Sequence, residues 1–138
     1  MDHVLLFSDG ACRGNPGMGA IAAAVFNEGG TEIAWDGSVI GETTNNRAEY
    51  RALILGLELS ARYTRGGVSC YSDSELLVKQ LNREYRVRDK RLRTLFIQVH
   101  AFAEVFERVS FKHVRRDDPG ITRVDSLAND LLDAEVAG

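Results

Sequence analysis

The stretch FSDGACRGNPGMGA, from Phe7 to Ala20, places an aspartate directly after an apolar run and follows it with a glycine-rich segment. The apolar run predicts a first β-strand over Val4–Ser8, so that Asp9 marks the end of the strand. Asp-Gly pairs are common in turns, and Asp9 alone is compatible with a turn residue. The segment Gly14–Gly17 predicts either an ordinary hairpin connection or a loop whose backbone can approach another molecule closely, because glycine has no side chain.

The rest of the chain alternates between strand-like and helix-like patterns and contains no internal repeat, low-complexity tract or linker. Period-two and short apolar runs predict further strands, and longer 3.6-residue patterns predict helices. The predicted order is β-β-β-α-β-α-α-β-α, an α/β fold with one five-stranded mixed sheet flanked by helices. The predicted strands after the first are Ala20–Phe26, Thr31–Ile40, Val68–Ser72 and Val109–Val114, and the predicted helices are Asn46–Arg62, Glu75–Leu81, Leu92–Phe106 and Ile121–Val136.

Length and composition indicate one globular domain over residues 1–138, with 44% hydrophobic residues and no apolar run long enough to cross a bilayer. The N-terminus has no basic segment before its short apolar stretch, which argues against a signal peptide. Two cysteines, Cys12 and Cys70, are too few for a disulfide framework. We therefore expect a cytoplasmic protein with free thiols that acts as a monomer, without a membrane or protein partner.

The charge of the chain is unevenly distributed, although the formal net charge is only −3. This net charge argues against indiscriminate binding of nucleic acid. The segment Arg83–Arg93, however, holds six basic and two acidic residues. It is compatible with a solvated helix edge and with a ridge that contacts phosphates.

Four carboxylates stand out by position, and each has a local explanation. Besides Asp9 in a turn, Glu49 could complete a capping box with Asn46. Asp73 follows a predicted strand and could favour the start of the next helix. Asp125 could belong to a cap-like pattern with Thr122 at the start of the last helix.

Taken together, the four acids predict a metal site. If the first and fourth strands are neighbours in the sheet, Asp9 and Asp73 lie side by side at the strand ends, where sites form in open sheets. Four unpaired carboxylates in one pocket repel one another unless cations hold them. Oxygen ligands prefer hard cations such as magnesium or manganese, as in two-metal phosphodiester chemistry.

The chain resembles the type 1 ribonuclease H family over essentially its whole length. The resemblance is carried by four motifs in order: SDGACRGNPGMGA, TTNNRAEYRAL, YSDSELLV and VDSLAND. It implies the ribonuclease H fold and hydrolysis of the RNA strand of RNA/DNA hybrids, leaving 5′-phosphate and 3′-hydroxyl ends. It also implies that two magnesium ions, or manganese, are held by Asp9, Glu49, Asp73 and Asp125, and that Glu49 can read the RNA 2′-hydroxyl.

The resemblance also implies where the hybrid is held. Residues at matching positions are Cys12, Asn15, Asn45 and Asn46 for backbone or minor-groove contacts and Thr44 for a DNA phosphate, although Asn46 could also be a helix cap. From the basic segment, we expect Arg86, Arg88 and Arg91 to contact the hybrid.

Two departures place the chain with the members of the family that lack a loop histidine and an extra basic helix. The loop before Asp125 contains no histidine, and Arg116 or Asp118 could partly replace it. Only the segment Tyr85–Arg91 stands where other members insert an extra basic helix. This difference predicts weaker and more salt-sensitive binding of the hybrid.

Three alternatives remain open from the sequence. One is a nuclease of the same fold that also cuts double-stranded RNA or hybrid junctions. Another is a non-catalytic module that binds hybrids. The third is a structural domain in which the four acids serve only as helix caps and turns.

Overall fold

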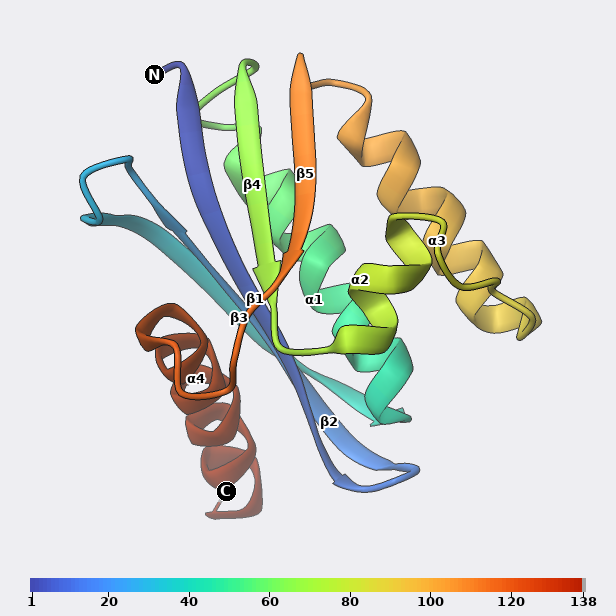
Figure 1. Cartoon of the computed structure of the whole chain (residues 1–138). Coiled ribbons are helices and arrows are strands. Elements are labelled where there is room, and N and C mark those ends of the chain that lie inside the picture. The colour runs from blue at the N-terminus through green and yellow to red at the C-terminus, as the bar shows by residue number, and fades with distance from the viewer. Residues whose placement is uncertain (138) are drawn as a thin grey trace.

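The computed structural model describes residues 1–137 and contains one five-stranded sheet with four helices. The strand order is β3-β2-β1-β4-β5; β1, β2 and β3 are antiparallel, and β4 and β5 run parallel to β1. This confirms the predicted mixed sheet and element order (Figure 1). The strands are β1 (His3–Gly14), β2 (Gly17–Phe26), β3 (Glu32–Thr43), β4 (Gly67–Ser72) and β5 (Arg108–His113), and the helices are α1 (Asn45–Ser60), α2 (Glu75–Leu81), α3 (Lys90–Ala103) and α4 (Pro119–Ala137).

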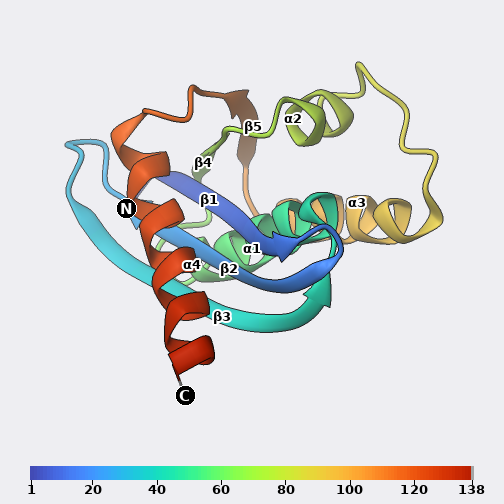
Figure 2. The same ribbon diagram turned by 90° about the horizontal axis from the view of Figure 1, so that it is seen from below.

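Helices cover both faces of the sheet. Figure 2 shows α4 on one face, and α1 on the other with α3 outside it. The inner strand β2 is accordingly buried along Ala20–Val25, which is expected for a strand covered on both sides. Strand β1 alternates: Val4 and Leu6 face the core beneath α1, whereas Phe7 and Ala11 face the core beneath α4. Each face of β1 can thus present residues to a different helix.

Small residues spaced four apart along α1, Ala52, Gly56 and Ser60, let this helix lie close against the sheet. Ala52 and Ser60 are fully buried, and a Cβ atom added at Gly56 would lie 2.5 Å from Leu6 Cδ1. Within residues 1–137, none of the helices combines the length and the apolar character needed to cross a bilayer.

The prediction that β1 ends near Asp9 is wrong. The strand continues to Gly14, with Asp9 opposite Ala22, and Asn15 and Pro16 form the turn into β2. The segment was mistaken for a loop because of its glycines, yet these residues permit close packing within the hairpin. A Cβ atom at Gly17, for example, would collide with the Arg13 carbonyl group. Asp9 is therefore held by strand pairing on one side, and its explanation as a turn residue does not apply.

Candidate active site

The step in the sheet where β4 ends and β1 continues brings two carboxylates together. Parallel pairing of β1 with β4 aligns Phe7 with Tyr71, and Asp9 and Asp73 each lie two residues further along the chain. The expectation that the first and fourth strands are neighbours is thus confirmed. Asp73 stands just outside β4, and the cap of the following helix is Ser74, whose hydroxyl accepts a hydrogen bond from the Leu77 N–H group.

Glu49 reaches the same place from α1. Its Oε1 atom accepts a hydrogen bond from the Gly10 N–H group at 2.6 Å. The predicted capping box between Asn46 and Glu49 is not formed, because the N-cap is Thr44, which accepts from the Arg47 N–H group. Asn46 is accordingly not the cap, and the carboxylate of Glu49 is directed toward the sheet.

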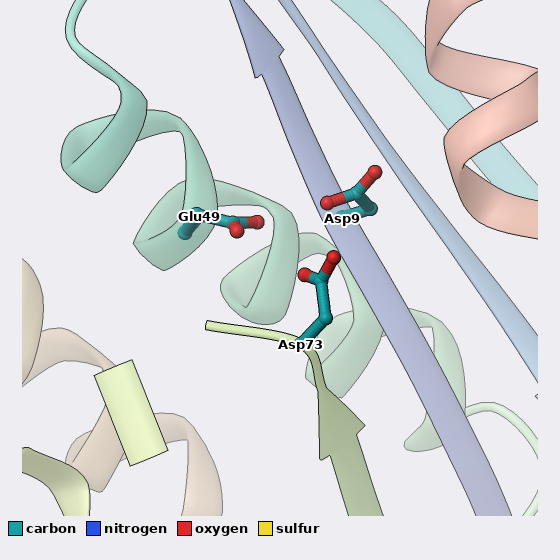
Figure 3. A group of neighbouring side chains, drawn as sticks. All are labelled: Asp9, Glu49 and Asp73. Atoms are coloured by element: carbon teal, nitrogen blue, oxygen red, sulfur yellow. The ribbon is translucent and has the colours of Figure 1, made fainter. Parts of the chain in front are cut away.

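Three of the predicted carboxylates meet. Oxygen atoms of Asp9, Glu49 and Asp73 all lie within 4.8 Å of one another. Figure 3 shows these three side chains converging from β1, α1 and the segment after β4. Within residues 1–137, no ion pair to Lys, Arg or His neutralises any of them.

Asp125 approaches the three from α4 and lines the same hollow, where its carboxylate adds to the raised pKa of Asp9. Helix α4 begins at Pro119, where Asp118 accepts a hydrogen bond from the Gly120 N–H group at 2.8 Å, so Asp125 lies in the helix interior. Its predicted role in a cap is therefore wrong, and Asp118 has the capping role instead. The four acids share an acidic hollow of about 450 Å³, lined by Asp9, Gly10, Ala11, Cys12, Asn45, Asn46, Glu49, Asp73, Ser74, Arg116, Asp125 and Asn129.

Burial and mutual repulsion disfavour the charged forms of these acids. Burial, followed by the charges of Glu49 and Asp73, raises the pKa of Asp9 to about 10. Burial also raises the pKa of Glu49 to about 7, although the hydrogen bond from Gly10 opposes the shift. Strongly perturbed carboxyl groups in a cleft are typical of functional sites, and an all-oxygen cluster suits a hard divalent cation.

We expect the metal-free protein to lose stability as the pH rises from about 4.5 to 7. The folded-state pKa values of Asp9 and Glu49 exceed the values of about 4 in an unfolded chain, so the folded state binds more protons over this range. The stabilisation is complete below pH 4 and is lost as the pH rises through the folded-state values. One pKa unit corresponds to about 1.4 kcal/mol, so a fall of at least about 1 kcal/mol is expected.

Urea unfolding at a series of pH values, with a chelator present, measures this fall. The Glu49→Gln variant is the matched control, because it cannot titrate at this position and should show a shallower profile. Identical profiles for the two proteins would contradict the assignment to Glu49.

The predicted substrate contacts separate into three groups. Cys12, Asn45 and Asn46 line the acidic hollow. Asn15, Thr44 and Arg91 line a second hollow of about 330 Å³. Arg86 and Arg88 lie apart from both, in an arginine hollow of about 930 Å³ between α2 and α3, which is lined by Gln80, Arg83, Glu84, Tyr85, Arg86, Val87, Arg88, Arg93, Phe96 and Ile97.

Comparison with known proteins identifies the family. Residues 7–130 match the family model described as reverse transcriptase-like. The crystal structure of RNase H1 from Halobacterium salinarum superimposes with a TM-score of 0.91 at 36% identity, covering 96% of this chain and 98% of that one. The chain belongs to the type 1 ribonuclease H family.

Two further ribonuclease H relatives extend the comparison. LC11-RNase H1, crystallised in complex with an RNA/DNA hybrid, has a TM-score of 0.90 at 31% identity and covers 96% of this chain and 99% of that one. The bifunctional protein Rv2228c of Mycobacterium tuberculosis is 36% identical over 95% of this chain. The chain spans only 36% of the length of that mycobacterial protein.

Sequence reasoning missed three polar residues around the acidic hollow and the second hollow of this ribonuclease H family member. Arg47 donates to Thr44 Oγ1 from both its backbone N–H and its Nε atom, at 3.3 and 3.2 Å. Asn129 lies one helical turn after Asp125 and hydrogen-bonds to it, and Arg13 contacts Asn129 from β1. Helical spacing could have indicated Asn129, but nothing local in the sequence joins Arg13 to α4.

Proposed function

We propose that this chain is a metal-dependent endonuclease that hydrolyses the RNA strand of RNA/DNA hybrids and leaves 5′-phosphate and 3′-hydroxyl ends. The observation that carries the proposal is the convergence of the Asp9, Glu49 and Asp73 carboxylates, with oxygens within 4.8 Å of one another, in a chain of the ribonuclease H family. We further propose that residues 1–138 form a single ribonuclease H domain, acting as a monomer in the cytoplasm.

The four acids are the proposed ligands of two divalent ions, magnesium or manganese. Asp9, Glu49, Asp73 and Asp125 offer only oxygen donors and have no partner cations among residues 1–137, which suits hard ions. Such ions, when bound, supply activation of water and stabilisation of charge on the phosphate. Cation binding would also compensate the repulsion among these carboxylates.

The chain's own groups prepare the site for the substrate. The Gly10 N–H group fixes one oxygen of Glu49, which leaves the other available to accept a hydrogen bond from a 2′-hydroxyl group, the feature that distinguishes RNA from DNA. Arg116, from the loop before α4, lines the acidic hollow and offers an exposed guanidinium group. We assign Arg116 to the scissile phosphate or the departing 5′-phosphate, in place of a loop histidine.

We propose that the second hollow is the binding site for a phosphate of the DNA strand. Thr44 Oγ1 accepts both hydrogen bonds from Arg47, so the hydroxyl proton remains free to be donated to a phosphate oxygen. Arg91 and Asn15 line the same hollow. Asn46 lines both this hollow and the acidic one, and Asn45 beside it lines the acidic hollow, which suits contacts to the minor groove between the two strands.

Replacing Arg86, Arg88 and Arg91 together with Ala should raise the KM for the hybrid and flatten its dependence on salt. Each lost phosphate contact lowers the slope of log affinity against log salt by roughly 0.7–0.9. Of these three arginines, only Arg91 lines the second hollow with Thr44. The single Arg91→Ala variant should therefore raise KM and flatten the salt dependence more than Arg86→Ala or Arg88→Ala does. Steady-state kinetics between 50 and 200 mM salt measures these effects, and an unchanged slope in the triple variant would exclude contacts from this segment.

The proposed function is tested with a labelled RNA strand in an RNA/DNA hybrid, incubated with magnesium and then with manganese. Single-stranded RNA, double-stranded RNA and a DNA duplex of the same sequence are run in parallel. Metal-dependent cutting confined to the RNA of the hybrid, with 5′-phosphate ends, supports the proposal. Cutting of double-stranded RNA would widen the substrate class, and tight hybrid binding without cutting would instead indicate a binding module.

A further inference from the structure

A hydrogen-bonded chain of side chains links the far end of β1 to the carboxylate of Asp125. Asn129 Nδ2 donates to the Asp125 Oδ1 atom at 3.2 Å and to its backbone carbonyl at 2.9 Å. Arg13 Nη2 lies 3.4 Å from Asn129 Oδ1 and 2.7 Å from Asp133 Oδ1. One arginine thus contacts two residues of α4, and one of these contacts the acid.

The strand places this arginine and one of the clustered acids on the same side. Side chains alternate along a strand, so Asp9, Ala11 and Arg13 share one face of β1. Ala11 packs against the apolar residues of α4, which confirms that this face is turned toward the helix. Strand β1 therefore supplies both Asp9 and Arg13, and Arg13 contacts Asn129, the residue that hydrogen-bonds to Asp125.

We propose that Asn129 and Arg13 are positioning residues for Asp125, an inference that rests on the proposed metal-dependent function. An asparagine amide can face a carboxylate with its NH₂ group or, unfavourably, with its carbonyl oxygen. Arg13 donates to the Asn129 oxygen and so directs the NH₂ group toward Asp125. Partners that hydrogen-bond to metal ligands orient them, and their loss typically costs 10- to 100-fold in metal affinity or activity.

A merely structural role for Arg13 is insufficient to explain the arrangement. The Arg13–Asp133 ion pair is exposed, with 43% and 68% of the two side chains accessible, and exposed pairs contribute little stability. Helix α4 is held independently through buried residues such as Ile121 and Val124. It has a second polar anchor, in which Arg123 donates to both carboxylate oxygens of Glu32.

The test compares Arg13→Gln, Arg13→Lys and Asn129→Ala with the control Glu32→Gln, which removes the other anchor of α4 away from the acidic hollow. Two readouts are required: kcat and KM on the hybrid across a magnesium series, and magnesium affinity by calorimetry without substrate. We expect Arg13→Gln and Asn129→Ala to lower kcat by about 10- to 100-fold and to weaken magnesium binding, with KM little changed. Arg13→Lys should recover part of both, and Glu32→Gln should remain close to the wild type.

Three outcomes would overturn the inference. A change in KM alone would make Arg13 a substrate contact, and equal losses in Glu32→Gln would reduce the network to an anchor of the helix. Unchanged magnesium affinity in both Asn129→Ala and Arg13→Gln would exclude positioning of a metal ligand. Failure of the proposed function is distinguishable, because the wild-type chain would then leave the hybrid intact while the calorimetric comparison still tests the role of Asn129.

Discussion

The Asp9→Asn variant is expected to cleave the hybrid at least about 10³-fold more slowly than the wild-type chain and yet to unfold at a higher temperature in the absence of metal. Loss of a carboxylate proposed to hold the metal ions would remove several kcal/mol of metal-assisted stabilisation, and each 1.4 kcal/mol corresponds to about tenfold in rate. The same substitution removes the free-energy cost of holding an acid at this position, where burial and then its acidic neighbours raise the pKa of Asp9 to about 10. Stability and activity should therefore change in opposite directions.

Thermal unfolding with a chelator and with magnesium, beside single-turnover cleavage, measures both effects. The Asp130→Asn variant is the matched control, because it removes an exposed carboxylate from α4 and should alter neither quantity appreciably. Magnesium should raise the melting temperature of the wild type and of this control. The increase should be much smaller for Asp9→Asn. If Asp9→Asn were both as active as the wild type and no more stable without metal, Asp9 would have only a structural role.

The Gly10→Ala variant should lose both stability and activity, although the substitution adds a single methyl group. The added Cβ atom would lie 2.5 Å from the backbone carbon of Ala48 and 2.7 Å from its Cβ atom, so α1 must move away from β1. Overpacking of this kind costs about 1–3 kcal/mol, or roughly 3–10 °C in melting temperature for a chain of this size. The shift also displaces Glu49, and misplacement by about 1 Å can cost on the order of 10²-fold in rate.

Thermal unfolding and kcat on the hybrid test this expectation. Gly29→Ala is a suitable control, since its added Cβ would meet only the Asn27 Oδ1 atom, at 3.3 Å, in an exposed turn. Wild-type activity in Gly10→Ala would mean that the contact between β1 and α1 does not set the position of Glu49.

The topology was predictable because it depends on patterns that are local in sequence. The apolar run that starts β1 predicts a buried strand, and the small residues Ala52, Gly56 and Ser60 in α1 indicate which face of that helix lies against the sheet. The grouping of Asp9 with Asp73 needed only one assumption, that β1 and β4 are neighbours, and the sheet bears this out.

Local patterns failed where two interpretations compete for the same residues. The glycines after Asp9 are typical of a loop, but they serve the close packing of a hairpin that continues to Gly14. Thr44 and Asn46 are both good helix caps, and the sequence alone does not decide between them. The structure assigns the cap to Thr44, whose hydroxyl also accepts from Arg47 Nε.

Contacts between distant segments could not be predicted at all. Arg13 and Asn129 are 116 positions apart, and no periodic pattern relates a residue of β1 to one of α4. The basic segment was treated as one ridge, but Arg91 shares a hollow with Thr44 whereas Arg86 and Arg88 line another. Side-chain direction along an irregular segment depends on its packing, which the sequence does not encode in any simple period.

The four acids come from β1, α1, the end of β4 and α4, and this spread along the chain has a consequence for folding during synthesis. A chain emerging from the ribosome completes the first hairpin and α1 early, but Asp125 follows only when the last helix has been synthesised and has docked on the sheet. A nascent chain that stops before Asp125 lacks one of the four carboxylates. Under the proposed function, a translating ribosome would therefore carry an inert precursor, and the ability to cut nucleic acid would arise only after α4 has been made and has docked.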